Sequence, residues 1–167
     1  MMGYSGGGQF VHRFMYLHAE RLRAVSIGAP GRVTMLDEEV KWPNGVKDLN
    51  EVFGDGTVAK KDVMRKMPIQ LAVGGEDNLV HGGDEFCEWL EGKKKELTKD
   101  KINANMANNE PGRLMLGRLD TLKALQLAWQ EGISPNLEIV DGLKHDSGGV
   151  LDVVQAFFRL HIRSIID

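Results

Sequence analysis

Short apolar runs and longer segments of helical periodicity alternate along the chain. Three of the runs have the length and composition of strands buried on both faces, and they cover residues 22–28, 68–73 and 137–140. Each run ends at a glycine or leads into a turn that contains one, which is a common end signal for such a strand. The sequence therefore predicts three buried strands.

The segments between these runs carry apolar residues at every third or fourth position, as amphipathic helices do. This spacing predicts helices over residues 9–21, 84–97, 114–130 and 150–165. Strands that alternate with helices indicate an α/β fold with a parallel sheet.

Two further segments carry little periodicity. Residues 31–66 contain the turn-forming sequences WPNG at 42–45 and GDG at 54–56, with a short helix expected before Met67. Residues 93–113 begin with three lysines, which we interpret as a solvated helix end. Both are expected to be loop-rich excursions of one packed unit, or of part of one, that covers residues 1–167.

Composition narrows the class of protein. With 42% hydrophobic and 27% charged residues, the chain has the balance of a globular domain. Its net charge of -3 provides no basic field for a nucleic-acid partner. A single cysteine, Cys87, rules out an intrachain disulfide and any multi-cysteine metal site. No apolar run approaches the ~20 residues that cross a bilayer, so no membrane segment is expected. The absence of a signal-peptide pattern slightly favours the cytoplasm without excluding secretion.

The first chemically informative motif is GYSGG at residues 3–7, a G-x-S-x-G sequence that leads directly into a predicted helix. In a nucleophile elbow the turn holds the serine, here Ser5, in a strained conformation, and glycines two residues to either side let neighbouring backbone pass. The backbone N–H of Gly6 would then lie at a helix N-terminus, where it can donate to an oxyanion.

A phosphate-binding loop is the rival interpretation of this glycine-rich segment. Gly3 and Gly8 have the spacing of a Walker A motif, but Gln9 and Phe10 stand where lysine and serine or threonine are needed. The dinucleotide-binding pattern G-x-G-x-x-G fails as well, because Val11 occupies its last position.

A nucleophilic serine needs a histidine base and a carboxylate that orients the histidine. Asp77 follows the predicted strand 68–73, and His145 follows the strand 137–140. The carboxyl ends of parallel strands meet at one edge of a sheet, so these side chains are expected to converge with Ser5. Glu76 remains a substitute for Asp77, and His81 is a candidate for the pocket lining. We interpret the remaining histidines as structural or solvent-facing: His12, His18 and His161.

The order serine, acid, histidine is that of the α/β-hydrolases. Residues 1–10 and 26–31, WPNG at 42–45, GEDN at 75–78 and the strand leading to His145 resemble poorly characterised, esterase-like members of that superfamily over nearly the whole chain. The resemblance implies that Ser5 is the nucleophile, Asp77 the acid, His145 the general base and the Gly6 N–H an oxyanion donor. It implies a small-molecule acyl substrate, no cofactor and no metal.

Members of the superfamily place about four further strands before the elbow, so the sequence resembles a C-terminal half. The expected fold is thus the C-terminal part of an α/β-hydrolase fold, with about four parallel strands and helices on both faces. The expected function is a serine hydrolase that cleaves an ester or related acyl compound through an acyl-enzyme. The alternative is a truncated, inactive remnant or an incomplete gene model with at most a binding role. A third possibility is another acyl transfer or peptide cleavage. The sequence gives no indication of oligomeric state.

Overall fold

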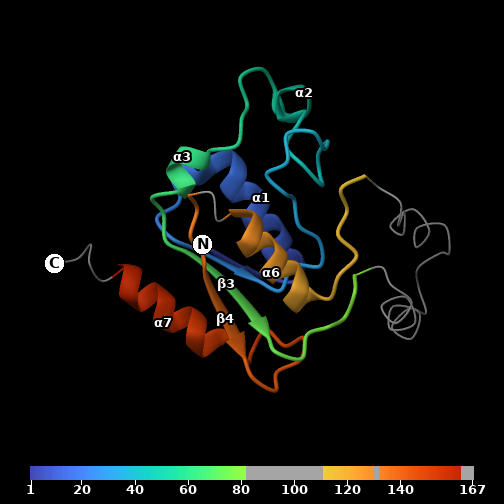
Figure 1. The fold of residues 1–167 in the computed structure, drawn as a ribbon. Coiled ribbons are helices and arrows are strands. Elements are labelled where there is room, and N and C mark those ends of the chain that lie inside the picture. The colour runs from blue at the N-terminus through green and yellow to red at the C-terminus, as the bar shows by residue number, and fades with distance from the viewer. Residues whose placement is uncertain (82–110, 130–131, 163–167) are drawn as a thin grey trace, which may run out of the picture.

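The computed structural model describes residues 1–81, 111–129 and 132–162. In these parts of the chain, four strands form one parallel sheet in the spatial order β1-β2-β3-β4 (Figure 1). Their bounds are β1 Met2–Tyr4, β2 Val25–Gly28, β3 Ile69–Gly74 and β4 Asn136–Val140. The three predicted runs are therefore strands, and the short strand before Ser5 completes the expected parallel sheet.

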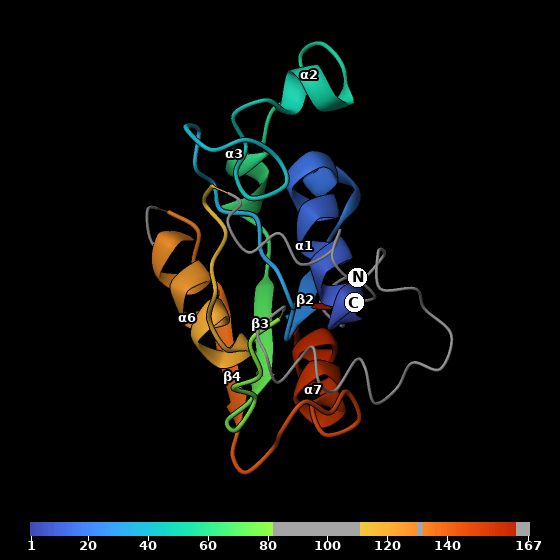
Figure 2. The same cartoon turned by 90° about the vertical axis from the view of Figure 1, so that its right-hand side faces the viewer.

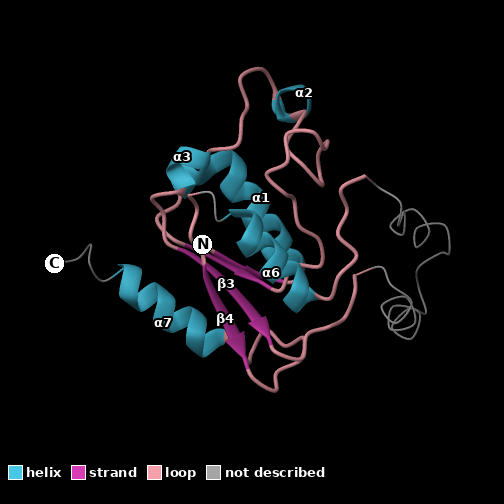
Figure 3. Ribbon diagram, viewed as in Figure 1, coloured by secondary structure: helices cyan, strands magenta, loops and turns pink. Residues whose placement is uncertain are grey.

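Within the described residues, three longer helices pack against the sheet, and two short ones lie in the excursion after β2 (Figure 3). The longer helices are α1 Gly6–His18, which continues into the 3-10 turn η1 Ala19–Arg21, α6 Arg118–Trp129 and α7 Leu151–Ile162. The short helices are α2 Leu49–Phe53 and α3 Lys61–Met64, the second of which is the helix expected before Met67. The helix predicted over residues 84–97, with Cys87, lies outside the described residues. So does most of the predicted excursion over 93–113.

Side chains of β3 alternate between the two faces of the sheet, as the pleat requires. Leu71 and Val73 join a buried cluster with side chains of α1 and α6, whereas Ala72 packs with Val150 and Val154 at the start of α7. Figure 2 shows α6 and α7 on opposite sides of β3. Helices therefore cover both faces, as the sequence predicted.

Three elements begin three or four residues away from their predicted starts. Helix α1 begins at Gly6 and not at residue 9, because the Ser5 carbonyl already accepts the Gln9 N–H at 3.0 Å. The strand predicted from residue 22 begins at Val25. Helix α6 begins at Arg118 and not at residue 114, since Gly117 instead forms an antiparallel bridge with Val80.

The excursion after β2 is fastened to α1 through Thr34. The Thr34 N–H donates to Nε2 of His12 at 2.8 Å, and the Tyr16 hydroxyl donates to the Thr34 carbonyl at 2.7 Å. Nε of Arg13 donates to the Thr34 hydroxyl oxygen at 3.0 Å. All three helical side chains come from consecutive turns of α1, so this part of the excursion is held in place beside the helix.

Candidate active site

Ser5 occupies a strained turn between β1 and α1. Its backbone angles are φ 54° and ψ -117°, a conformation that costs a non-glycine residue about 1–3 kcal/mol. The Ser5 N–H donates to the Gly28 carbonyl of β2 at 2.8 Å, which holds the turn against the sheet. The next residue, Gly6, begins α1, and the first N–H groups of a helix have no partner within it. A donor is thereby available beside Ser5 for a developing oxyanion.

Close backbone approach explains two of the glycines around Ser5. A Cβ at Gly3 would overlap the Gly7 carbonyl, and a Cβ at Gly8 would overlap the Gly28 carbonyl. A Cβ at Gly7, in contrast, would meet no atom within 4 Å. The glycine expected two residues before Ser5 is thus required by packing. Packing does not require glycine at Gly7, two residues after Ser5. It requires glycine at Gly8 instead, because Gly8 faces β2.

The loops that follow β3 and β4 are bonded to one another. The Gly75 N–H donates to the Val140 carbonyl at 2.8 Å, and the Glu76 N–H donates to the Leu143 carbonyl at 2.9 Å. A Cβ at Gly74 would overlap the same Leu143 carbonyl, so only glycine lets the two loops approach this closely. These contacts bring the segments that carry Asp77 and His145 together.

Asp77 and His145 are in direct contact. Oδ2 of Asp77 lies 2.6 Å from Nδ1 of His145, a short distance typical of a charge-assisted hydrogen bond. The Asp77 side chain is fully buried, whereas 29% of the His145 side chain is exposed. Glu76, the substitute considered from the sequence, is exposed. The contact leaves Nε2 of His145 available to a partner.

Tyr4 connects this pair with the serine turn. Its ring lies 5.0 Å from the His145 ring between centroids, tilted by 35°. Burial, followed by the charge of Asp77, raises the pKa of Tyr4 to about 12, so the phenol is neutral at ordinary pH. Because Tyr4 directly precedes Ser5, its contact with His145 places the histidine beside the turn. Tyr4 is a variable residue of the G-x-S-x-G motif, so the motif itself predicts no role for it.

The other histidines have different surroundings. Burial, together with the charge of Arg13, lowers the pKa of His12 to about 3, so His12 is neutral and serves as the acceptor for Thr34. His81 packs against Gly31, and burial with nearby arginines lowers its pKa to about 4. His18 lies 3.9 Å from Glu20, and the His161 ring packs on Phe157.

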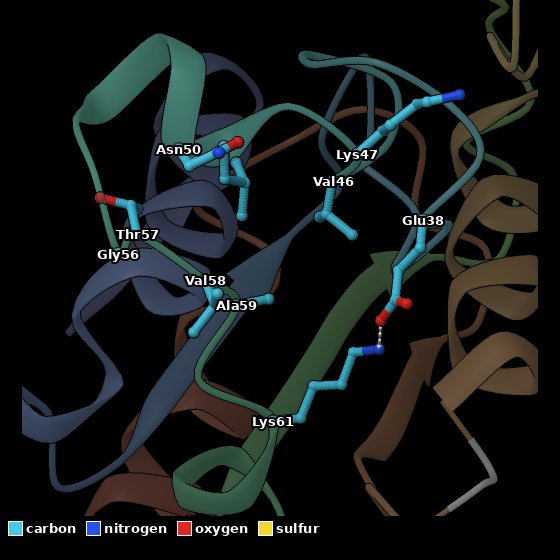
Figure 4. A pocket seen from close by; sticks show the side chains of 10 residues that line it. Glu38, Val46, Lys47, Asn50, Gly56, Thr57, Val58, Ala59 and Lys61 are labelled. Atoms are coloured by element: carbon cyan, nitrogen blue, oxygen red, sulfur yellow. Dashed lines mark hydrogen bonds and ion pairs between the residues drawn. The ribbon is translucent and has the colours of Figure 1, made fainter.

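Two cavities adjoin the site residues, and a third lies apart from them. One of about 430 Å³ lies at the Asp77–His145 contact and is lined by Glu76, Asp77, Asn78, Leu79, Lys144 and His145. A second, of about 340 Å³, begins at Gly6 and is lined further by Gln9, Phe10, Arg13, Phe14, Leu17, His18, Trp42 and Phe53. A third, of about 550 Å³, lies between Glu38 and Lys61, which form an ion pair at 2.6 Å (Figure 4). The third cavity contains none of the predicted site residues.

The described residues also bear on metal binding and membrane crossing. Among them, no three His, Cys, Asp or Glu side chains gather in a way that could hold a metal ion. Within the same residues, no helix combines the length and apolar character needed to cross a bilayer.

Comparison with known proteins identifies the architecture. No protein-family model matches the chain, and no curated protein matches it significantly. Among solved structures, poly(aspartic acid) hydrolase-1 from Sphingomonas sp. KT-1 superposes with a TM-score of 0.59 at 19% identity, over 93% of this chain and 52% of that one. Poly(3-hydroxybutyrate) depolymerase from Bordetella parapertussis gives 0.55 at 21% identity, over 95% and 48%.

The fold is that of the α/β-hydrolases. This confirms the fold predicted from the serine motif and the order of the three site residues. The chain spans about half the length of each of these two structures. In an open α/β sheet, sites form at the carboxyl ends of the strands. Ser5, Asp77 and His145 all follow the carboxyl end of a strand, namely β1, β3 and β4.

Proposed function

We propose that this chain carries the catalytic residues of a serine hydrolase that acts on an ester or related acyl compound. The observation that carries the proposal is the 2.6 Å contact between Asp77 and His145, next to a serine held at positive φ. A strained serine followed by a helix supplies an exposed nucleophile, and a histidine hydrogen-bonded to a buried carboxylate supplies an oriented base. The α/β-hydrolase fold is consistent with hydrolase chemistry at the level of the fold.

In the proposed mechanism, Oγ of Ser5 attacks the acyl carbonyl carbon while Nε2 of His145 takes the hydroxyl proton. Asp77 holds the proton on Nδ1 and stabilises the imidazolium that forms. The Gly6 N–H donates to the oxyanion of the tetrahedral intermediate. His145 then gives this proton to the leaving group, which departs and leaves the acyl group on Ser5. Water next attacks the acyl carbon while His145 takes a proton from it, and His145 returns that proton to Oγ of Ser5 as the acid product leaves.

Labelling with a fluorophosphonate tests the proposal without knowledge of the substrate. The intact protein is expected to be labelled, and Ser5→Ala is expected to abolish labelling and reduce ester hydrolysis by about 10³-fold or more. Ser147→Ala is the matched control, because Ser147 is an exposed serine two residues from His145. Persistent labelling of Ser5→Ala would overturn the assignment.

Two alternatives are outcomes of the same experiment. An unlabelled wild-type protein that is folded supports the inactive remnant with a binding role. A labelled protein that cleaves a peptide and no p-nitrophenyl ester supports a peptidase. The solved neighbours are named for poly(aspartic acid), which is joined by amide bonds, and poly(3-hydroxybutyrate), which is joined by ester bonds. Both bond types therefore belong in the substrate panel.

A further inference from the structure

The start of α6 is packed tightly onto the loop that carries Asp77. The Leu119 N–H donates to the Asp77 carbonyl at 3.0 Å, and Gly117 forms a bridge with Val80. A Cβ at Gly117 would lie only 2.7 Å from the carbonyl oxygen of Asn78, so the two backbones meet at a distance that only glycine allows. The backbone around Asp77 is therefore fixed by the N-terminus of α6.

The first residue of α6, Arg118, brings a charge into this contact. Its side chain is 4% exposed, its Nη1 donates to the Leu79 carbonyl at 3.0 Å, and the same atom lies 3.6 Å from Oδ1 of Asp77. Among the described residues, Oδ1 of Asp77 accepts no hydrogen bond. The two carboxylate oxygens of Asp77 thus have different partners: Oδ2 contacts His145, and Oδ1 faces the guanidinium of Arg118.

A fully buried carboxylate is costly unless a cation accompanies it. Among the described residues, the titratable and charged groups around Asp77, His145 and Arg118 are Tyr4 from β1, Arg118 from α6, Glu76 and His81 from the segment after β3, and Lys144 and Asp146 from the loop after β4. Burial lowers the pKa of His81 to about 4, so its ring is neutral at ordinary pH. Tyr4 is neutral, while Glu76, Lys144 and Asp146 are solvent-exposed. Arg118 is therefore the buried cation of this group.

We propose that Arg118 is a positioning residue: its buried guanidinium faces Oδ1 of Asp77 and thereby leaves Oδ2 directed at His145. Its catalytic meaning rests on the proposed hydrolase function, but its electrostatic effect on the Asp77–His145 pair does not. The sequence around Arg118 gives no signal of this role, because an arginine in the first turn of a helix is ordinarily a solvated residue.

The test is an NMR titration of the His145 ring in the intact protein and in Arg118→Gln. Glutamine retains a donor for the Leu79 carbonyl but removes the positive charge. Because the charge of Arg118 repels a proton on the Asp77–His145 pair, its removal is expected to move the midpoint of the His145 titration to higher pH. Arg118→Lys retains the charge and is expected to keep the wild-type midpoint. Arg65→Gln, at an exposed arginine paired with Asp62, is the matched control.

An unchanged midpoint in folded Arg118→Gln overturns the proposal. If Arg118→Gln fails to fold, Arg118→Lys provides the test. A wild-type His145 midpoint in Arg118→Lys supports the role of the charge, whereas a shifted midpoint or loss of the Asp77 contact indicates a purely steric role and overturns the proposal. The NMR readout needs no catalysis, so it separates this inference from the proposed function. In an active protein, the acid limb of the labelling rate against pH is expected to move with the His145 midpoint.

Discussion

At the scale of single residues, the serine turn depends on which neighbours lack a Cβ. Ser5 itself is held at positive φ by bonds on both sides, its N–H on Gly28 and its carbonyl on Gln9. Gly3 and Gly8 allow the backbone of α1 to contact β1 and β2 without side chains between them. Strain at Ser5 and close packing beside it are therefore parts of one arrangement.

This arrangement predicts opposite effects of two similar substitutions. Gly3→Ala forces a Cβ into the Gly7 carbonyl and is expected to lower the free energy of unfolding by about 2 kcal/mol or more. Gly7→Ala places its Cβ in open space within α1 and is expected to be neutral or stabilising by up to about 1 kcal/mol. Urea denaturation of both variants measures the difference. Equal losses of stability in the two variants would show that close approach is not what requires glycine.

At the scale of elements, His12 links α1 to the excursion after β2 only while it is neutral. The Thr34 N–H needs the lone pair of Nε2, which protonation removes. Burial of the ring, which comes first, and the charge of Arg13 lower the pKa of His12 to about 3 in the folded chain, against about 6.5 for an unperturbed histidine. Between pH 3 and pH 6.5, His12 is therefore protonated in the unfolded chain and neutral in the folded chain.

The contribution of neutral His12 to the free energy of unfolding is fully present above pH 6.5 and is lost as the pH falls toward 3. His12 is expected to contribute a slope of up to about 1.4 kcal/mol per pH unit across this window. Thermal denaturation of wild type and His12→Gln between pH 7 and pH 4 measures it, and the variant is expected to have the shallower slope. His18→Gln, at a partly exposed histidine of the same helix, serves as the control. Parallel slopes for wild type and His12→Gln would rule out this role.

At the scale of the whole molecule, one edge of the sheet is apolar. Among the described strands, β1 pairs only with β2, and Met1 and Met2 are 42% and 43% exposed. A groove of about 470 Å³ beside them is lined by Met2, Leu151, Val154, Gln155, Phe158, Arg159 and Ile162. An unpaired strand edge next to an apolar groove promotes association with other chains.

Expressed as these 167 residues, the protein is therefore expected to self-associate as its concentration rises. Met2→Lys places a charge on the edge and is expected to shift the population toward the 18.6 kDa monomer. Leu127→Lys, at a position 66% exposed on α6, controls for added charge alone. Size-exclusion chromatography with light scattering distinguishes the variants. A wild-type chain that stays monomeric at every concentration would contradict this prediction.

Local features of this protein were determined by its sequence alone. The apolar runs predicted β2, β3 and β4, and G-x-S-x-G before a helix predicted the turn at Ser5, because these depend on neighbours within a few residues. Strand order and motif together also predicted that Asp77 and His145 follow strands at the same edge of the sheet.

Only the tertiary structure decided which side chains meet there. Contact between Asp77 and His145, 68 residues apart, requires the hydrogen bonds between the loops after β3 and β4. Burial of Asp77, exposure of Glu76, and the approach of Tyr4 and Arg118 likewise depend on packing between distant segments. Residue type does not encode such packing, since a buried arginine and an exposed one have the same local sequence signal.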